Sequence, residues 1–281
     1  MFHRGKNDNM PWMRKSQGDP PAVEASTLKR YKFYIHQTMT ESKIHFFDLL
    51  SDLPGPSKSW SPFTLRTRMV LNFKGIPYTQ SWISYPDIEP FLKAQGVTPD
   101  GVLMDSESIA TYIDKVYPSP PLFPSGDASY SLLVAVLNII DKIAPFYKPL
   151  IIPNVPSGLD ERGREYFIRT RSAAFGKPLL EVKPTDEAEL LALWQLIEEV
   201  AEPLVVMLKG KNGKKGPFLE GERAGYADVV LAALLAWFQR FGPDTFKKIL
   251  DLGNGEFKAF YEACLPWLEG QGEEKDWPIS Q

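Results

Sequence analysis

A serine at the predicted start of a helix is the residue of this chain best placed to hold an anion. Ser61 is followed by Pro62, and these residue types are favoured at the N-cap and first position of a helix. Apolar residues then recur at every fourth position: Leu65, Met69 and Phe73. The first turn of a helix presents unpaired N–H groups and a partial positive charge, so a thiol held there ionises more readily. The pattern predicts that Ser61 holds a thiolate; the alternative is that Ser61 only caps its helix.

The expected effect on a thiol is large enough to matter for catalysis. A hydrogen bond from the Ser61 hydroxyl to a charged sulfur contributes about 1.5–3 kcal/mol, and the helix end contributes roughly 0.3–1 kcal/mol. Because one pKa unit corresponds to about 1.4 kcal/mol, the two contributions lower the pKa of the thiol by about two units. Such a thiol is a competent nucleophile near neutral pH. Ser59 offers a second hydroxyl, but it lies outside the predicted cap and ranks behind Ser61.

Two further segments place polar residues at predicted helix starts. Asp105 and Ser106 precede a helix with one apolar face, formed by Ile109, Ile113 and Val116. The segment Gly216–Val230 leads into an apolar helix that runs to Trp237. In order and spacing, these segments and the first one resemble the glutathione transferases that have a thioredoxin-like N-terminal domain.

The resemblance covers most of the chain, from about Met39 to about Trp267. The segment Leu49–Pro56, Leu-Leu-Ser-Asp-Leu-Pro-Gly-Pro, is similar in particular to the fungal etherase-type (FuA) class. That class is related to the bacterial lignin β-etherases. The resemblance therefore implies both a fold and a kind of chemistry.

The implied fold is α/β followed by all-α. A thioredoxin-like domain is expected over residues 42–123, and an all-helical domain over residues 127–270. A proline-rich linker separates them, with Pro118, Pro120, Pro121 and Pro124. Residues 1–41 are expected to be a disordered tail or an extension of the gene model, and residues 271–281 a second tail. In this interpretation translation starts at Met39.

The resemblance also implies a role for each polar residue. A serine that matches Ser61 donates its hydroxyl to the sulfur of glutathione. The pair Asp105–Ser106 holds the γ-glutamyl end, because a carboxylate can pair with the α-ammonium group and a helix N–H with the α-carboxylate. Arg66 occupies a position that is usually basic and can reach a carboxylate. For Arg66 and Arg68, however, a surface salt bridge is the first expectation.

The implied function is that of a glutathione transferase. The serine activates the glutathione thiolate for conjugation, ether cleavage or deglutathionylation of an apolar or aromatic compound. The alternative is a ligandin-type protein that binds phenolic compounds and is catalytically impaired. In the transferase interpretation, glutathione is a co-substrate and no metal is required. A homodimer is possible, a cytoplasmic location is expected, and neither nucleic acid nor a membrane is an expected partner.

The chain departs from the family at the strand that normally begins with a cis-proline. The segment Gly96–Ser106 is too short for the strand, turn and strand expected there. Pro99 is a poor substitute, because Asp-Gly, a turn signal, follows it. We expect either that Val102–Met104 moves inward to pair with Ile44–Leu50, or that the domain is weakened by unpaired backbone groups.

Composition excludes several other classes of site. The net charge is -3, which argues against nucleic acid and anionic membranes as main partners. The chain has three histidines and one cysteine, too few for a metal cluster or a disulfide framework. Cys264 is expected to be a core residue of the last helix. The most apolar run, Leu132–Ile140, is too short to span a bilayer.

Overall fold

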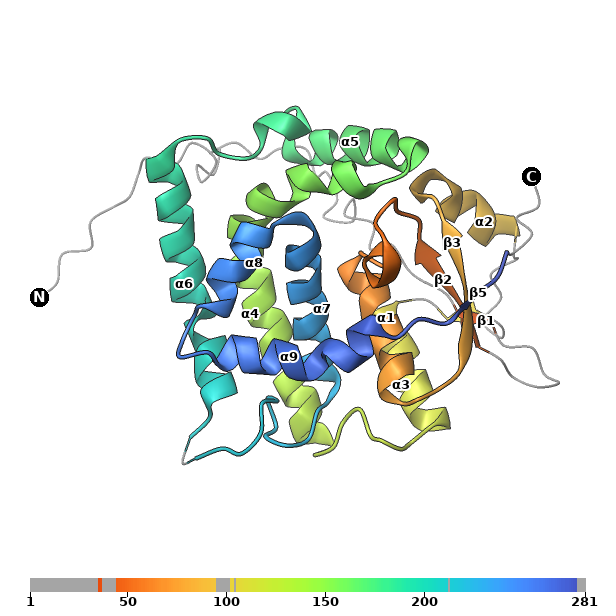
Figure 1. The fold of residues 1–281 in the computed structure, drawn as a ribbon, viewed down its shortest axis with the longest axis vertical. Coiled ribbons are helices and arrows are strands. Elements are labelled where there is room, and N and C mark those ends of the chain that lie inside the picture. Colours follow the sequence, from red (N-terminus) through yellow and green to blue (C-terminus); the bar gives the residue numbers. More distant parts are fainter. Residues whose placement is uncertain (1–34, 37–43, 95–101, 104, 212, 277–281) are drawn as a thin grey trace, which may run out of the picture. The chain divides into compact units, whose positions relative to one another are not determined.

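The computed structural model of this protein describes residues 35–36, 44–94, 102–103, 105–211 and 213–276. Pro99, Met39 and the segment that follows Gly96 lie outside these ranges. All the described residues belong to one compact unit. As the sequence predicts, an α/β part is followed by an all-helical part (Figure 1).

The α/β part is built around one fully buried strand. All six residues of β2 (Ile44–Leu49) are buried, and β2 pairs in parallel with β3 (Tyr78–Ile83). Burial on both faces is typical of an interior parallel strand, which explains the apolar run in the sequence. Helix α1 connects β2 to β3, and α2, β4 and α3 follow along the chain: α1 (Pro62–Phe73), α2 (Ile88–Ala94), β4 (Val102–Leu103) and α3 (Ser106–Val116).

The place beside β2 is filled by a strand from upstream of Met39. β1 (Ile35–His36) pairs antiparallel with β2 on one side and with β4 on the other. The five-stranded sheet has the order β4-β1-β2-β3-β5. The expectation that β4 would move inward onto β2 is therefore wrong. β1 takes that place, and two residues of the expected tail belong to the sheet.

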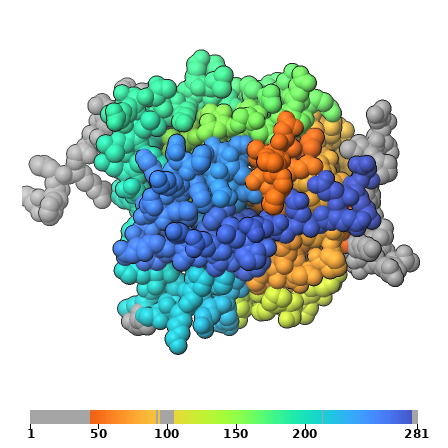
Figure 2. Space-filling model, in the orientation of Figure 1, coloured from red at the N-terminus to blue at the C-terminus, as the bar shows by residue number. Residues whose placement is uncertain are grey.

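The other edge of the sheet is covered by the C-terminal segment. β5 (Glu273–Glu274) pairs in parallel with β3, and the Lys275 N–H donates to Gln80 O at 2.9 Å. Figure 2 shows this segment, in dark blue, running from the helical part across to the α/β part. Residues 273–274, which were expected to lie in a tail, thus pair with an edge strand whose backbone groups would otherwise be free.

The helical part is organised around α7 (Tyr226–Phe241), which is buried along almost its whole length. α7 packs against α1, α4, α8 and α9. The remaining helices are α4 (Asp127–Ile151), α5 (Glu161–Phe175), α6 (Glu187–Lys209), α8 (Pro243–Leu250) and α9 (Glu256–Glu269). Short 3-10 helices complete the described secondary structure: η2 (Gly55–Lys58), η3 (Tyr85–Asp87), η4 (Ile152–Gly158) and η5 (Leu179–Glu181).

Two expectations about single elements can be compared with the structure. Cys264 is completely buried in α9, and burial raises the pKa of its thiol well above the ordinary value, so it is a core residue. The apolar run in α4 is longer than expected: by length and composition alone, Asp127–Gly158 could cross a membrane. α4 packs against α6 and α7, and 33% of its most apolar 18-residue window is buried.

A buried carboxylate fixes the start of α7. Asp228 accepts from the Gly225 N–H at 2.8 Å and from the Leu219 N–H at 2.8 Å. This is the acidic half of a capping box, in which Gly225 supplies no side chain. Burial raises the pKa of Asp228 to about 6, and the two N–H donors oppose this rise.

This pKa predicts a pH dependence of stability. Because the folded pKa lies above the unfolded value, the contribution of Asp228 to stability is full at low pH and is lost as pH rises through about 6. Asp228→Asn removes the titration. The wild-type free energy of unfolding, minus that of the variant, should fall by about 2.5 kcal/mol between about pH 4 and pH 7. Denaturant unfolding at each pH measures this, and a constant difference would contradict it.

Candidate functional site

Ser61 is the N-cap of α1, as its neighbours in the sequence predict. Its side chain accepts a hydrogen bond from the Phe63 N–H at 3.4 Å, and the residue is 3% exposed. Among the described residues, the Ser61 hydroxyl donates no hydrogen bond. Its proton is thus free to be donated to an anion at the helix N-terminus.

Ser59 faces a different environment. Its hydroxyl is fully buried and makes no hydrogen bond of standard geometry within the described part of the chain. It lies toward the Asp48 carboxylate, whose ionised form it stabilises together with Thr64 and Arg68. Burial is the larger effect and raises the pKa of Asp48. Ser59 therefore belongs to a buried polar cluster behind α1 and does not cap that helix.

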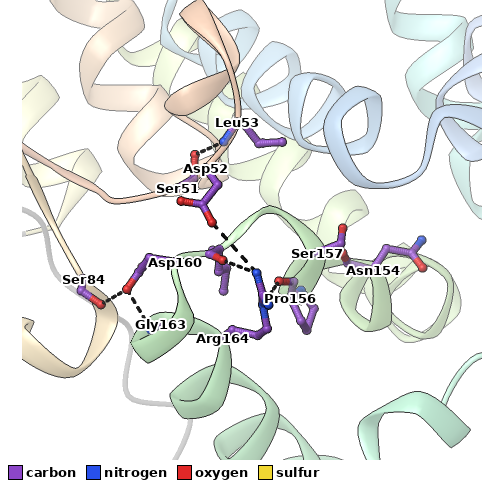
Figure 3. A network of polar contacts seen from close by, with 11 residues as sticks. Ser51, Asp52, Leu53, Ser84, Asn154, Pro156, Ser157, Asp160, Gly163 and Arg164 are labelled. Atoms are coloured by element: carbon purple, nitrogen blue, oxygen red, sulfur yellow. Dashed lines mark hydrogen bonds and ion pairs between the residues drawn. The ribbon is translucent and has the colours of Figure 1, made fainter.

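The loop that leads to Ser61 is anchored on the helical part. The Asp52 N–H donates to Gly158 O at 2.9 Å, and Arg164 lies 4.0 Å from the Asp52 carboxylate. Figure 3 shows Asp52 and Arg164 beside the start of α5, where the Ser84 hydroxyl donates to Asp160 at 2.7 Å. These contacts limit the movement of the segments that precede and follow α1, and so of the loop that leads to Ser61.

An aromatic cluster extends this anchoring. Trp60, immediately before Ser61, is 2% exposed and packs edge-on against Phe241 at 5.5 Å between ring centroids. Tyr85 and Phe167 complete the cluster around Trp60. These rings come from the α/β part, α5 and α7. They are large apolar groups packed together, and they hold the backbone at Ser61 in place.

Asp105 has an unusual backbone conformation. Its φ is 74°, the only positive φ among the described residues that are not glycine. Such a conformation costs roughly 1–3 kcal/mol, and strain of this kind concentrates at functional sites. Asp105 is the N-cap of α3, yet its carboxylate makes no capping hydrogen bond. The carboxylate accepts one long hydrogen bond, from the Ser108 hydroxyl at 3.5 Å, and its charge can still pair with a cationic group beside the buried Ser106.

Tyr226 joins the predicted site residues, and sequence reasoning missed it. The charges of Arg66 and Asp105 and the side chain of Ser106 all act on its hydroxyl. Burial is the largest effect and raises the pKa of Tyr226 to about 12. The structure thus brings Arg66, Asp105 and Ser106 together around Tyr226. In the sequence, Tyr226 is only the first residue of a buried helix, and nothing there indicates that it lies near Arg66, Asp105 and Ser106.

Within the part of the chain that the structure describes, Arg66 and Arg68 form none of the expected surface salt bridges. Arg66 is half-buried, lies over the Phe63 ring at 5.1 Å, and its Nε has no partner in the described ranges. Arg68 is fully buried and donates to three carbonyls: Gly270 O at 2.8 Å, Leu268 O at 2.6 Å and Pro56 O at 3.2 Å. The expectation was wrong because helix periodicity alone did not show that the C-terminal segment covers this face of α1.

The described ranges bring together no group of three or more His, Cys, Asp and Glu side chains that could hold a metal ion. The chemistry available to the site is that of a hydroxyl donor, two helix N-termini, one carboxylate and one guanidinium. This set suits a ligand that carries an ionisable thiol and a zwitterionic end.

Family models match both parts of the chain. The model "Glutathione S-transferase, N-terminal domain" matches residues 57–121, which include Ser61 and Asp105. The model "Glutathione S-transferase, C-terminal domain" matches residues 135–267. The first match spans the α/β part from η2 to α3, and the second covers the helical part from α4 to α9.

A curated relative is similar over almost its full length. The "Glutathione S-transferase-like protein ustS" of Aspergillus flavus is 47% identical over 266 residues, covering 86% of this chain and 96% of the relative. The aligned span is longer than the part of this chain that it covers, so the relative contains residues that this chain lacks.

Solved structures show the same fold. A glutathione S-transferase of Ceriporiopsis subvermispora, solved in complex with glutathione, is 28% identical, with a TM-score of 0.68, over 79% of this chain and 96% of its own. Glutathione transferase GSTFuA3 of Phanerochaete chrysosporium is 28% identical, with a TM-score of 0.70, over 80% of this chain and 97% of its own. The α/β part is thus the thioredoxin-like domain expected from the sequence.

Proposed function

The chain belongs to the glutathione S-transferase family, and on that premise we propose that it binds glutathione and activates its thiol with Ser61. The observation that carries the proposal is the Ser61 hydroxyl at the N-terminus of α1, which donates no hydrogen bond to any described residue. Both the hydroxyl and the helix end favour a thiolate over a thiol. Asp105 and Ser106 take the γ-glutamyl end.

The reaction proposed is a nucleophilic substitution or addition by sulfur. The thiol gives its proton to water, and the thiolate forms a bond to an electrophilic carbon of an apolar or aromatic compound. In a substitution, the leaving group departs with the electron pair of its bond to that carbon. In an addition, the electron pair of the acceptor's double bond moves to its far atom, which takes a proton from water. In deglutathionylation, the thiolate instead attacks the sulfur of the conjugate and forms glutathione disulfide, and the released carbon keeps the electron pair and takes a proton from water. Ser61 stabilises the charged sulfur and forms no covalent bond to the substrate.

Within the family we propose the FuA class. The structural similarity to GSTFuA3, and to GSTFuA2 of the same organism at a TM-score of 0.70 and 27% identity, supports this. Aryl-ether cleavage or deglutathionylation then follows as the proposed chemistry. A cytoplasmic location belongs to the same proposal.

We also propose that two copies associate. Several large apolar side chains of α3 and α4 are exposed: Tyr112, Val116, Tyr130 and Val134. Such residues are favourable at an interface between copies. Sedimentation of the purified chain measures the oligomeric state, and a monomer at high concentration would contradict this part of the proposal.

Calorimetric titration of reduced glutathione into the full chain tests the proposal, and Asp105 provides the sharpest variant. In Asp105→Gly, the free energy of unfolding should rise by about 1 kcal/mol, because glycine adopts a positive φ without strain. Affinity for glutathione should fall by about tenfold or more, because the ammonium group loses its charged partner.

Asp105→Asn separates the two effects. Asparagine tolerates a positive φ and keeps the size of the side chain, so stability should stay near that of the wild type. Its affinity for glutathione should fall as in the glycine variant. Unchanged affinity in both variants would remove Asp105 from the site. A folded wild-type chain that does not bind glutathione would defeat the proposal and favour the ligandin-type alternative.

A further inference from the structure

We propose that β1 (Ile35–His36) holds the two halves of the glutathione site in register, so that binding requires this segment upstream of Met39. The inference rests on the proposed function. It assigns a positioning role to a segment that is absent from any chain starting at Met39. The role lies in the backbone of β1, because its pairing partners are the backbones of β2 and β4.

One half of the site depends on β2. This strand leads to the loop that carries Ser61, and its residues are buried on both faces. On one side β2 pairs with β3; on the other, Phe46 and His45 face Ile35 and His36. Without β1, backbone groups of β2 would be buried without partners, which is costly in a dry interior.

The other half of the site depends on β4. Val102 and Leu103 pair with His36 and Ile35, and the chain then reaches Asp105 and Ser106 within three residues. In the described part of the sheet, β4 has no other strand beside it, because it is the first strand in the order β4-β1-β2-β3-β5. β1 is therefore the only sheet connection between β4 and β2.

Helix packing supplies a second connection. α1 packs against α3, so the two helices stay in contact whether or not β1 is paired. Packing of helix faces tolerates small sliding movements, whereas a backbone ladder fixes register to one residue. The strained φ of Asp105, which follows β4 closely, shows that the backbone is constrained at this point.

Proline substitution in the full chain tests this role. Ile35→Pro and His36→Pro each remove one N–H from an interior strand, where proline is not accommodated. We expect the affinity for reduced glutathione, measured by calorimetry, to fall by about tenfold or more. Ile35→Val keeps the N–H and a β-branched side chain, so its affinity should stay within about twofold of the wild type.

Hydrogen exchange gives a readout that does not need glutathione. In the proline variants, amides of β2 and β4 should exchange faster, while those of α7 keep their protection. If a proline variant does not fold, Ile35→Gly, which keeps the N–H and only weakens the strand, should show the same two changes to a smaller degree.

The outcomes separate this inference from the proposed function. Wild-type affinity and wild-type exchange of β2 and β4 in Ile35→Pro would overturn the role of β1. Faster exchange of β2 and β4 with unchanged glutathione affinity would also overturn it, because the site would not depend on the ladder. If the wild type does not bind glutathione, the proposed function fails, and the exchange data alone then decide whether β1 orders the sheet.

Discussion

Replacing Ser61 by alanine should lower turnover by about 30- to 100-fold at neutral pH, with little change in glutathione affinity. The lost hydroxyl contributes about 1.5–3 kcal/mol, which corresponds to about one to two units in the pKa of the bound thiol, while the helix end remains. The contact favours the charged sulfur over the whole ligand, so kcat falls and the dissociation constant does not. Steady-state kinetics with an aryl-halide probe, together with calorimetry, measure both quantities.

The control for this prediction is the neighbouring serine. Ser59→Ala removes a hydroxyl that faces the Asp48 cluster, so turnover should remain within about threefold of the wild type. Ultraviolet titration of the bound thiolate adds a second readout, in which the pKa should rise in Ser61→Ala only. If Ser59→Ala loses activity and Ser61→Ala keeps it, the assignment of the two serines must be reversed.

Replacing Arg68 by methionine should lower the free energy of unfolding by about 3–5 kcal/mol. The guanidinium is fully buried and bonds to carbonyls of Gly270, Leu268 and Pro56. Burial raises the pKa of the Asp48 carboxylate, and the charge of Arg68 opposes this rise. The substitution removes the Arg68 donor from Leu268 O and leaves the Asp48 carboxylate without its counter-charge. Gly270 O keeps the Asn72 amide at 2.9 Å, and Pro56 O keeps Arg240 at 3.4 Å. Denaturant unfolding at neutral pH measures the loss.

The same helix provides a matched control. Arg66→Met removes a half-buried guanidinium that forms no hydrogen bond within the described residues, so stability should change by less than about 1 kcal/mol. In the double variant Asp48→Asn with Arg68→Met, part of the loss should be recovered, because no unpaired charge remains. Equal losses in the two arginine variants would show that Arg68 acts by packing alone.

The sequence predicted an element correctly where the residues that indicate it lie within that element. The Ser-Pro pair at residues 61–62 and the recurring apolar positions after it predicted the start of α1 and its apolar face. The apolar helix expected to run to Trp237 likewise forms α7, which extends to Phe241. In both cases the signal lies within one element, so the position of a hydroxyl at a helix start could be predicted without knowing the tertiary packing.

The sequence was uninformative where segments distant along the chain meet. β5 has two residues, both glutamate, and its identity as a strand depends on β3. Arg68 was predicted to be a surface residue because nothing local shows that Gly270 and Leu268 cover it. Tyr226 was missed for the same reason, since Arg66 and Ser106 come from other helices.

The pairing of β5 with β3 has a consequence for synthesis in the cell. β3 is made early, and β5 is made only after every helix that the structure describes has been translated. The α/β domain therefore cannot reach its final form before β5 has emerged from the ribosome, although its other described elements are already made. Until then the edge of β3 stays open, and a nascent chain that stalls before Gly270 would present that edge to chaperones or to other chains.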